Sequence, residues 1–257
     1  MEIEYVPVLA VLRDLYARPR DASRFGAYLD AMLQGTGDVV LPIAAANPMA
    51  REHALARVVE LLDLGAEALG ASAAADAAAR LTDVDDRLRA SLVLADDVAG
   101  GWTNRYLTEA SGRFADRVDR KRNAVAALLW ASESPAPDRI RQTLLGDLYR
   151  AAYRRRLGPA RTLRAMLAQE GRTAAFAGAR PALPPAQTAA ARATIAPFLD
   201  SATYSQQFAA LYGDAPAVSV GYVPLGLPAR AGFEVALEDA LSGGEDPVAA
   251  LLGTPPA

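Results

Sequence analysis

Residues 95–106, with the sequence ADDVAGGWTNRY, combine two carboxylates, two aromatic rings, an amide and a guanidinium around a pair of glycines. Adjacent glycines permit a sharp reversal of the chain, including positive φ values. Polar groups that converge beside an aromatic wall are the usual make-up of a small-molecule site. We therefore expect this corner to bind a small polar or anionic ligand, with or without catalysis, through Asp96, Asp97, Trp102, Asn104, Arg105, Tyr106 and Glu109.

A structural interpretation of the same corner stays open. Apolar residues at helical spacing, from Leu88 to Ala95, predict a helix that ends at the glycines. Asp96 and Asp97 then lie in its last turn, where the helix macrodipole disfavours a carboxylate. Arg105 would return across the turn to form a bidentate ion pair with one of them. In that case the corner is a clasp between two helices and not a ligand site.

Other catalytic chemistries find little support in the sequence. The absence of cysteine excludes disulfides and thiolate sites. His53 is the only histidine, so a two-histidine zinc motif is impossible and no metal site is expected. We interpret His53 as a half-exposed side chain on the flank of a helix. No G-x-S-x-G, Walker A or G-x-G-x-x-G sequence occurs, so catalytic residues and cofactor stay unassigned.

Residues 149–164, YRAAYRRRLGPARTLR, form a second and weaker candidate site. Arginines at the C-terminus of a helix interact favourably with the helix dipole, even on a solvated face. A row of arginines can also bind an anion or RNA. The net charge of the chain is −3, whereas proteins that bind nucleic acid are usually basic. We therefore expect a small ligand and not a nucleic acid as the partner. Arg155 continues the apolar series from Ile140, so we expect it to be buried against a carboxylate. The candidate anion-binding residues are Arg150, Arg154, Arg161 and Arg164.

Asn47 follows a short apolar run, VVLPIAAA, and precedes Pro48. Asparagine is a good N-cap and proline suits the first helical position, so we expect a helix to start here. Its N-terminus is a ready anion site, although simple capping explains the asparagine equally well.

Capped segments with apolar residues at helical spacing run through nearly the whole chain. We therefore predict an all-α, irregularly packed single domain over residues 1–257, with about eight to ten helices. The proline-bearing residues 133–137 are the best candidate for an internal boundary. Two short stretches, 39–43 and 217–223, have strand character but are too few to found a sheet. Prolines, glycines and alternating valines at 215–228 predict an extended arm.

Composition and the N-terminus indicate a soluble cytoplasmic protein. Hydrophobic residues make up 52% of the chain and charged residues 22%, which is ordinary for a globular domain. Glu2 and Glu4 stand where a secretory signal carries positive charge, and no apolar stretch of about 20 residues predicts membrane insertion.

The alternative function is an interaction or scaffold protein that uses apolar helix faces and the 215–228 arm, homo-oligomers included. A third is polyanion or RNA binding through Arg150–Arg164.

Overall fold

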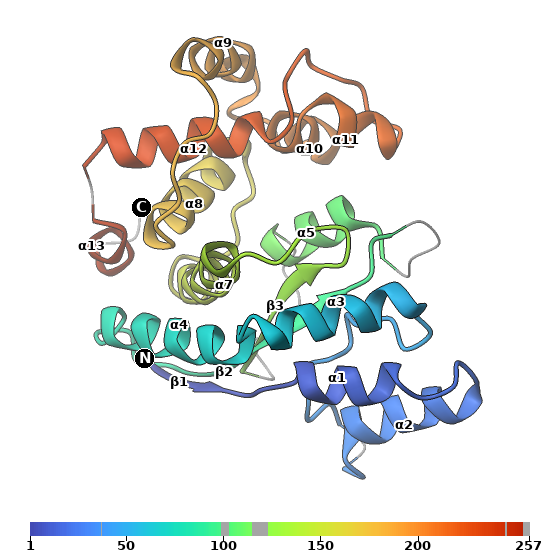
Figure 1. The fold of residues 1–257 in the computed structure, drawn as a ribbon. Coiled ribbons are helices and arrows are strands. Elements are labelled where there is room, and N and C mark those ends of the chain that lie inside the picture. Colours follow the sequence, from blue (N-terminus) through green and yellow to red (C-terminus); the bar gives the residue numbers. More distant parts are fainter. Residues whose placement is uncertain (37, 99–102, 115–122, 245, 254–257) are drawn as a thin grey trace. The chain divides into compact units, whose positions relative to one another are not determined.

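The computed structural model describes residues 1–36, 38–98, 103–114, 123–244 and 246–253 (Figure 1). Packing divides them into two compact units. The first holds the described residues of 1–105 and 117–148, and the second those of 106–116 and 149–257. The expected boundary at 133–137 lies inside the first unit. Packing does not show whether the units fold separately, so the single domain stays a prediction.

The first unit is built on a parallel three-stranded sheet with the strand order β1-β2-β3. The central strand is buried on both faces, because Leu88 and all residues from 90 to 95 are inaccessible. Helix α4 packs against β1 and β2, helix α1 packs against β2, and α3 packs against α1. The elements are β1 (Glu2–Tyr5), α1 (Leu9–Tyr16), α2 (Ala22–Leu33), α3 (Glu52–Asp63), α4 (Ala66–Arg80), β2 (Arg87–Ala95) and β3 (Ala124–Trp130).

The expectation of an all-α fold is only partly confirmed. Helices dominate, with twelve α-helices in the described part of the chain, but the sheet was not expected. The error lies at residues 87–95, which were predicted as a helix. A strand buried on both faces is a continuous apolar run, and such a run satisfies helical spacing as well as strand spacing. The stretch 39–43, expected to have strand character, is irregular in the structure.

Helices α3 and α4 are separated at Gly65, which has a φ of 76°, and Gly70 lies inside α4. A Cβ atom on Gly70 would lie 2.6 Å from the Tyr5 ring, so only glycine lets β1 approach α4. Glu67 in the first turn of α4 accepts hydrogen bonds from the Tyr5 hydroxyl and from the backbone N–H of Leu9. These contacts fix where β1 ends and α1 begins.

The described residues of the second unit form helices and the loops between them, with no strand. Its core is aromatic: Phe208 and Tyr212 stack with ring centres 4.7 Å apart, and Phe233 meets Tyr212 edge-on. Among the described residues, none of the helices combines the length and the apolar character needed to cross a bilayer. The helices are α5 (Arg105–Phe114, in this unit from Tyr106 on), the end of α7 (Pro137–Leu157), α8 (Leu163–Phe176), α9 (Pro185–Ile195), α10 (Tyr204–Tyr212), α11 (Asp214–Ser219), α12 (Ala231–Ser242) and α13 (Pro247–Leu252).

The extended arm predicted at 215–228 is wrong. Residues 214–219 form helix α11, and the following residues turn back on it. The Asp214 carboxylate accepts hydrogen bonds from the backbone N–H groups of Leu225, Gly226 and Leu227. The prolines and glycines of this segment therefore shape a closed loop, and residues 217–223 are not a strand either.

The structure of helix α7 differs from the expectation that Arg155 is buried. Ile140, Leu144 and Leu148 are buried as predicted, but Arg155 is only half-buried. The helix passes from the first unit into the second after Leu148, so different neighbours set the buried face of its last turns. There the inward residues include Tyr149, which stacks on Phe176, and Arg150, which is 5% exposed.

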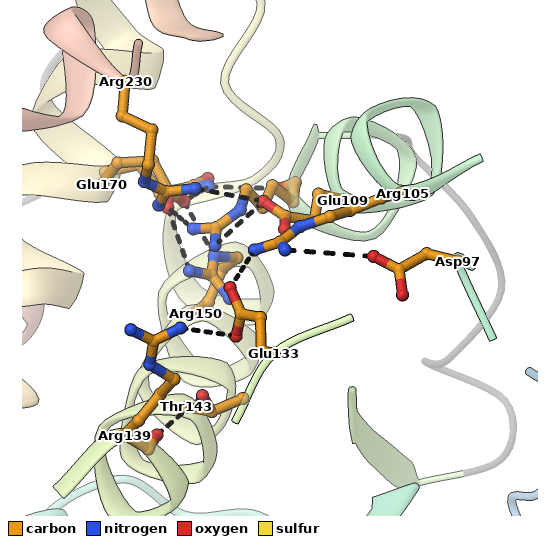
Figure 2. A network of polar contacts seen from close by, with 11 residues as sticks. Asp97, Arg105, Glu109, Glu133, Arg139, Thr143, Arg150, Glu170 and Arg230 are labelled. Atoms are coloured by element: carbon orange, nitrogen blue, oxygen red, sulfur yellow. Dashed lines mark hydrogen bonds and ion pairs between the residues drawn. The ribbon is translucent and has the colours of Figure 1, made fainter. Parts of the chain in front are cut away.

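Arg150 is buried because it is paired with Glu170 of α8 (Figure 2). The Glu170 carboxylate accepts hydrogen bonds from Arg150 Nε and Nη2 at 2.7 and 2.9 Å, and from Gln169 Nε2 at 2.9 Å. Arg113 of α5 forms a second ion pair with it. Burial acts to raise the pKa of Glu170, but the two guanidinium groups outweigh burial and lower it to about 2.

We expect Glu170→Gln to lower the free energy of unfolding at pH 7 by about 3–5 kcal/mol, since it leaves buried arginine without its carboxylate. Because the folded pKa lies below the unfolded one, the stabilisation is present above about pH 4.5 and is lost as the pH falls toward 2. Urea unfolding from pH 7 to pH 2 measures this. Glu238→Gln, which removes a half-exposed partner of Arg192, is the control and should cost less than about 1 kcal/mol, because Asp239 still pairs with Arg192. Parallel pH profiles for wild type and Glu170→Gln would contradict the assignment.

Candidate functional site

Two neighbouring strands of the first unit end in polar residues at the same edge of the sheet. Ala95 of β2 pairs with Trp130 of β3, and the residues that follow are Asp96 and Asp97 on one strand, then Ser132 and Glu133 on the other. In open sheets with parallel strands, ligands bind outside the carboxyl ends of the strands. Asp96 and Asp97 are therefore not in the last turn of a helix, and the macrodipole explanation for them is wrong.

Asp96 is a buried carboxylate, 2% exposed, with three hydrogen-bond donors. Its Oδ1 atom lies 2.8 Å from His53 Nε2, and its Oδ2 atom accepts from Asn47 Nδ2 at 2.9 Å. The backbone N–H of Val98 adds a longer bond of 3.3 Å to Oδ1. A buried carboxylate that is satisfied in this way can orient the side chains that contact it.

His53 lies in the first turn of α3, and its side chain is 32% exposed. An ionised carboxylate only accepts hydrogen bonds, so Nε2 donates to Asp96. The neutral ring then carries its lone pair on Nδ1. The half-exposed position expected for His53 is confirmed, but the contact with Asp96 makes the side chain a candidate acid–base group.

Asn47 orients Asp96 and is not the N-cap that the sequence suggested. Its Oδ1 atom accepts from the backbone N–H of Met49 at 3.0 Å, and residues 47–50 form a turn. Helix α3 begins at Glu52 with Arg51 as its cap residue. The amide is thus fixed on one side by the turn and donates to the carboxylate on the other.

Tyr16, at the end of α1, adds a buried hydroxyl close to Asp96. The hydroxyl makes no hydrogen bond to the described residues. Burial and then the negative charge of Asp96 raise its pKa above the ordinary value, so it stays protonated and can donate. Arg24 holds this region together, because its guanidinium donates to the backbone carbonyls of Tyr16 and Ala50, each at 2.9 Å.

Asp97 ties the ends of β2 and β3 together. Its carboxylate accepts from the backbone N–H of Ser132 at 2.9 Å and from the Ser132 hydroxyl at 2.6 Å. The nearest guanidinium nitrogen of Arg105 lies 3.9 Å away. Arg105 therefore does approach one of the two aspartates, as expected, but the shorter contacts of Asp97 are with the neighbouring strand.

Glu133 is the main partner of Arg105 (Figure 2). It also pairs with Arg139 at 2.8 Å. Burial acts to raise the pKa of Glu133, but the hydrogen bonds from Arg139 and Arg105 outweigh burial and lower it. The Arg105 guanidinium lies 5.4 Å from the centre of the Trp130 ring. This side of the edge is an ion-pair network supported by an aromatic ring.

The seven residues predicted for the ligand site fall in different parts of the chain as the structure divides it. Asp96, Asp97 and Arg105 lie at the sheet edge, and Asn104 directly precedes α5. Trp102 lies outside the described residues. Two others belong to the second unit. Tyr106 meets Tyr212 edge-on at 6.1 Å, and Glu109 pairs with Arg113 at 3.8 Å and Arg230 at 3.4 Å.

The arginines of the predicted anion-binding strip are not a common surface. Arg150 is buried against Glu170. Arg154 donates to the backbone carbonyl of Gly112 at 2.8 Å, and Arg164 pairs with Asp200 on the surface. Arg161 is exposed. The strip is therefore wrong as a continuous face, because its first residue serves the core.

Sequence reasoning passed over Tyr16, Ser132 and Glu133 and gave His53 no functional role. The signal that would have found Ser132 and Glu133 is a second apolar run, AVAALLWA, which ends immediately before these two polar residues. Together with residues 90–97 it describes two buried strands with polar carboxyl ends. Nothing local marks Tyr16, because its position depends on the packing of α1.

Comparison of the chain with models of protein families, with curated proteins and with solved structures found no match. Within the described ranges, no three side chains of His, Asp or Glu gather in a way that would hold a metal ion. The site must therefore be judged on its own geometry.

We expect neutral His53 to be protonated on Nε2, because Asp96 accepts from that atom. As the chain has a single histidine, nitrogen-15 NMR of the imidazole reports on this residue alone. Asp96→Ala should remove the preference, whereas Glu60→Ala, on the same helix but paired with Arg57, should leave it unchanged. A wild-type ring protonated mainly on Nδ1 would show that Asp96 is not its acceptor.

Arg105→Ala should lower the free energy of unfolding by about 1–3 kcal/mol, the usual range for lost hydrogen bonds to a charged group. The loss stays moderate because Glu133 keeps Arg139 and Asp97 keeps Ser132. Arg139→Ala is the matched control. Its side chain is 56% exposed, so it should cost less than about 1 kcal/mol in thermal or urea unfolding. Equal losses in the two variants would show that the Arg105 network does not stabilise the edge.

Proposed function

We propose that the chain binds a small polar or anionic molecule at the carboxyl edge of the sheet in the first unit, and that His53 exchanges a proton with it. One observation carries the proposal: a buried aspartate, bonded to Asn47 and held at the end of the central strand, fixes the only histidine by its Nε2 atom. This is the arrangement in which a carboxylate selects the imidazole tautomer and stabilises the imidazolium.

The guanidinium of Arg57 supports an anionic group on the ligand. Arg57 is one turn beyond His53 and so lies on the same side of helix α3. Its Nε atom donates to the backbone carbonyl of Ala131, directly after β3, at 3.2 Å, and this contact places the guanidinium at the sheet edge. Its Nη1 atom pairs with Glu60, whose side chain is 56% exposed, at 2.6 Å. In this proposal a carboxylate or phosphate of the ligand takes the place of Glu60 on Arg57, which brings the rest of the ligand toward His53.

The hydroxyl groups near the edge have different roles in this proposal. Ser132 donates its proton to Asp97 and is held between two strands, so we give it a structural role and not that of a nucleophile. Tyr16 keeps its proton and is a donor without an acceptor among the described residues. We therefore propose acid–base chemistry at His53, without a covalent intermediate.

A thermal-shift screen with phosphate, acetate, malonate, citrate and the common amino acids tests the proposal. A ligand present at about 100 times its Kd should stabilise wild type by about 2.7 kcal/mol through mass action. The stabilisation should be lost in His53→Ala and reduced in Asp96→Asn. Arg139→Ala, at the structural side of the same edge, should respond like wild type.

The same ligand must perturb the imidazole resonances of His53, which gives a readout that does not depend on stability. Binding that shifts the melting temperature of wild type and His53→Ala equally, and leaves these resonances unchanged, would place the ligand elsewhere and refute the proposal.

A further inference from the structure

Strand β3 is an edge strand, because the order of strands in the sheet is β1-β2-β3. The carbonyl of Asn123, directly before β3, accepts from the N–H of Arg89, and the N–H of Ala131, directly after β3, donates to the carbonyl of Ala95. Backbone groups of successive residues point alternately to the two sides of a strand. The odd-numbered residues of β3 therefore face β2, and the even-numbered residues face away from it.

Three even-numbered residues of β3 form an open edge: Ala124, Ala126 and Leu128. Their N–H and C=O groups make no hydrogen bond to the described residues, and all three residues are partly accessible. The next even-numbered residue, Trp130, is buried, and its carbonyl already accepts from the N–H of Glu133. A row of unpaired backbone groups along an edge strand is a template for pairing with another chain.

The opposite edge of the sheet carries the features that prevent such pairing. Strand β1 has only four residues, and two of them, Glu2 and Glu4, are exposed. Short length and exposed charge are the usual protection of an edge strand. Strand β3 has seven residues, AVAALLW, without charge, proline or glycine. The sheet is thus protected at β1 and unprotected at β3.

The pattern of free groups on β3 matches a second copy of the same strand. In an antiparallel pair about a two-fold axis at Ala126, this residue faces its own copy, and Ala124 faces Leu128 of the other copy. Residues paired in this way exchange both of their hydrogen bonds. This register therefore uses every free group of both strands and leaves the occupied carbonyl of Trp130 outside the pairing.

The absence of charge on β3 also favours a second copy. A two-fold contact places one patch against itself, and like charges directly opposite each other on neighbouring strands are destabilising. We propose that the chain forms a dimer in which β3 pairs antiparallel with β3 of a second copy, which extends the sheet across both molecules. The pairing does not involve His53 or Asp96, so it stands independently of the function proposed for them.

Sedimentation of the full chain tests the proposal. Wild type should be a dimer at about 100 µM, a concentration at which a contact with a micromolar Kd is largely formed. Ala126→Lys and Ala126→Glu each set like charges against each other at the axis, so each variant alone should be monomeric. An equimolar mixture of the two should dimerise, because the introduced charges then attract. Glu4→Lys, on the protected edge β1, is the control and should dimerise like wild type.

Cysteine cross-linking tests the register, since the chain has no cysteine of its own. Residues of a hydrogen-bonded pair have Cα atoms about 5.5 Å apart, which suits a disulfide. Ala126→Cys should therefore form a disulfide-linked dimer under mild oxidation. Ala124→Cys should not link to its own copy, but it should link to Leu128→Cys when the two variants are mixed.

Three results would overturn the proposal. They are a wild-type chain that stays monomeric at about 100 µM, dimers of both Ala126→Lys alone and Ala126→Glu alone, and cross-linking of Ala124→Cys alone that equals that of Ala126→Cys. Circular dichroism shows whether the charged variants fold. If they do not, the cysteine variants, which change the strand less, decide the question.

Discussion

Burial of β2 between two parallel neighbours is the constraint on which the rest of the first unit depends. Parallel strands require long crossover connections, and these bring every carboxyl end to one edge of the sheet. Successive side chains of an extended chain point to opposite sides. This alternation explains why Asp96 meets His53 and Asn47, whereas the adjacent Asp97 meets Ser132 and Arg105. Two neighbouring aspartates thus enter different environments.

From the sequence, a ligand site and a structural clasp were alternative interpretations of one corner. The two aspartates lie in different environments, so the sheet edge offers a place for each. Asp97 joins strand to strand, and Glu133 joins Arg105 to Arg139, so this half behaves as a clasp. The half around Asp96 fixes an imidazole and lies close to the Tyr16 hydroxyl, which has no partner among the described residues, and neither feature is needed to hold the strands together.

Helix positions were largely predictable, because capping residues and apolar spacing act locally. Thr162, for example, caps α8 with its own side chain, and Gly158-Pro159 marks the turn before it.

The sheet was not predictable in the same way. Apart from Ser91, residues 90–95 are all apolar, so they show no alternation. His53 and Asp96 are 43 residues apart, and only the pairing of β2 with its neighbours brings them together. Arg105 and Asp97 were predicted as partners because they lie close together in the sequence.

The buried and half-buried carboxylates differ in the cation that compensates the charge of each. Glu170 is held by Arg150 and Arg113, and Glu133 by Arg105 and Arg139. Arginine keeps its charge at every physiological pH, so these pairs are permanent and suit a structural role. Asp96 is paired with histidine, whose neutral ring has both a donor and an acceptor nitrogen. The pair at the sheet edge is therefore chemically different from the two arginine pairs, because an imidazole can both donate and accept a proton, whereas a guanidinium cannot accept one.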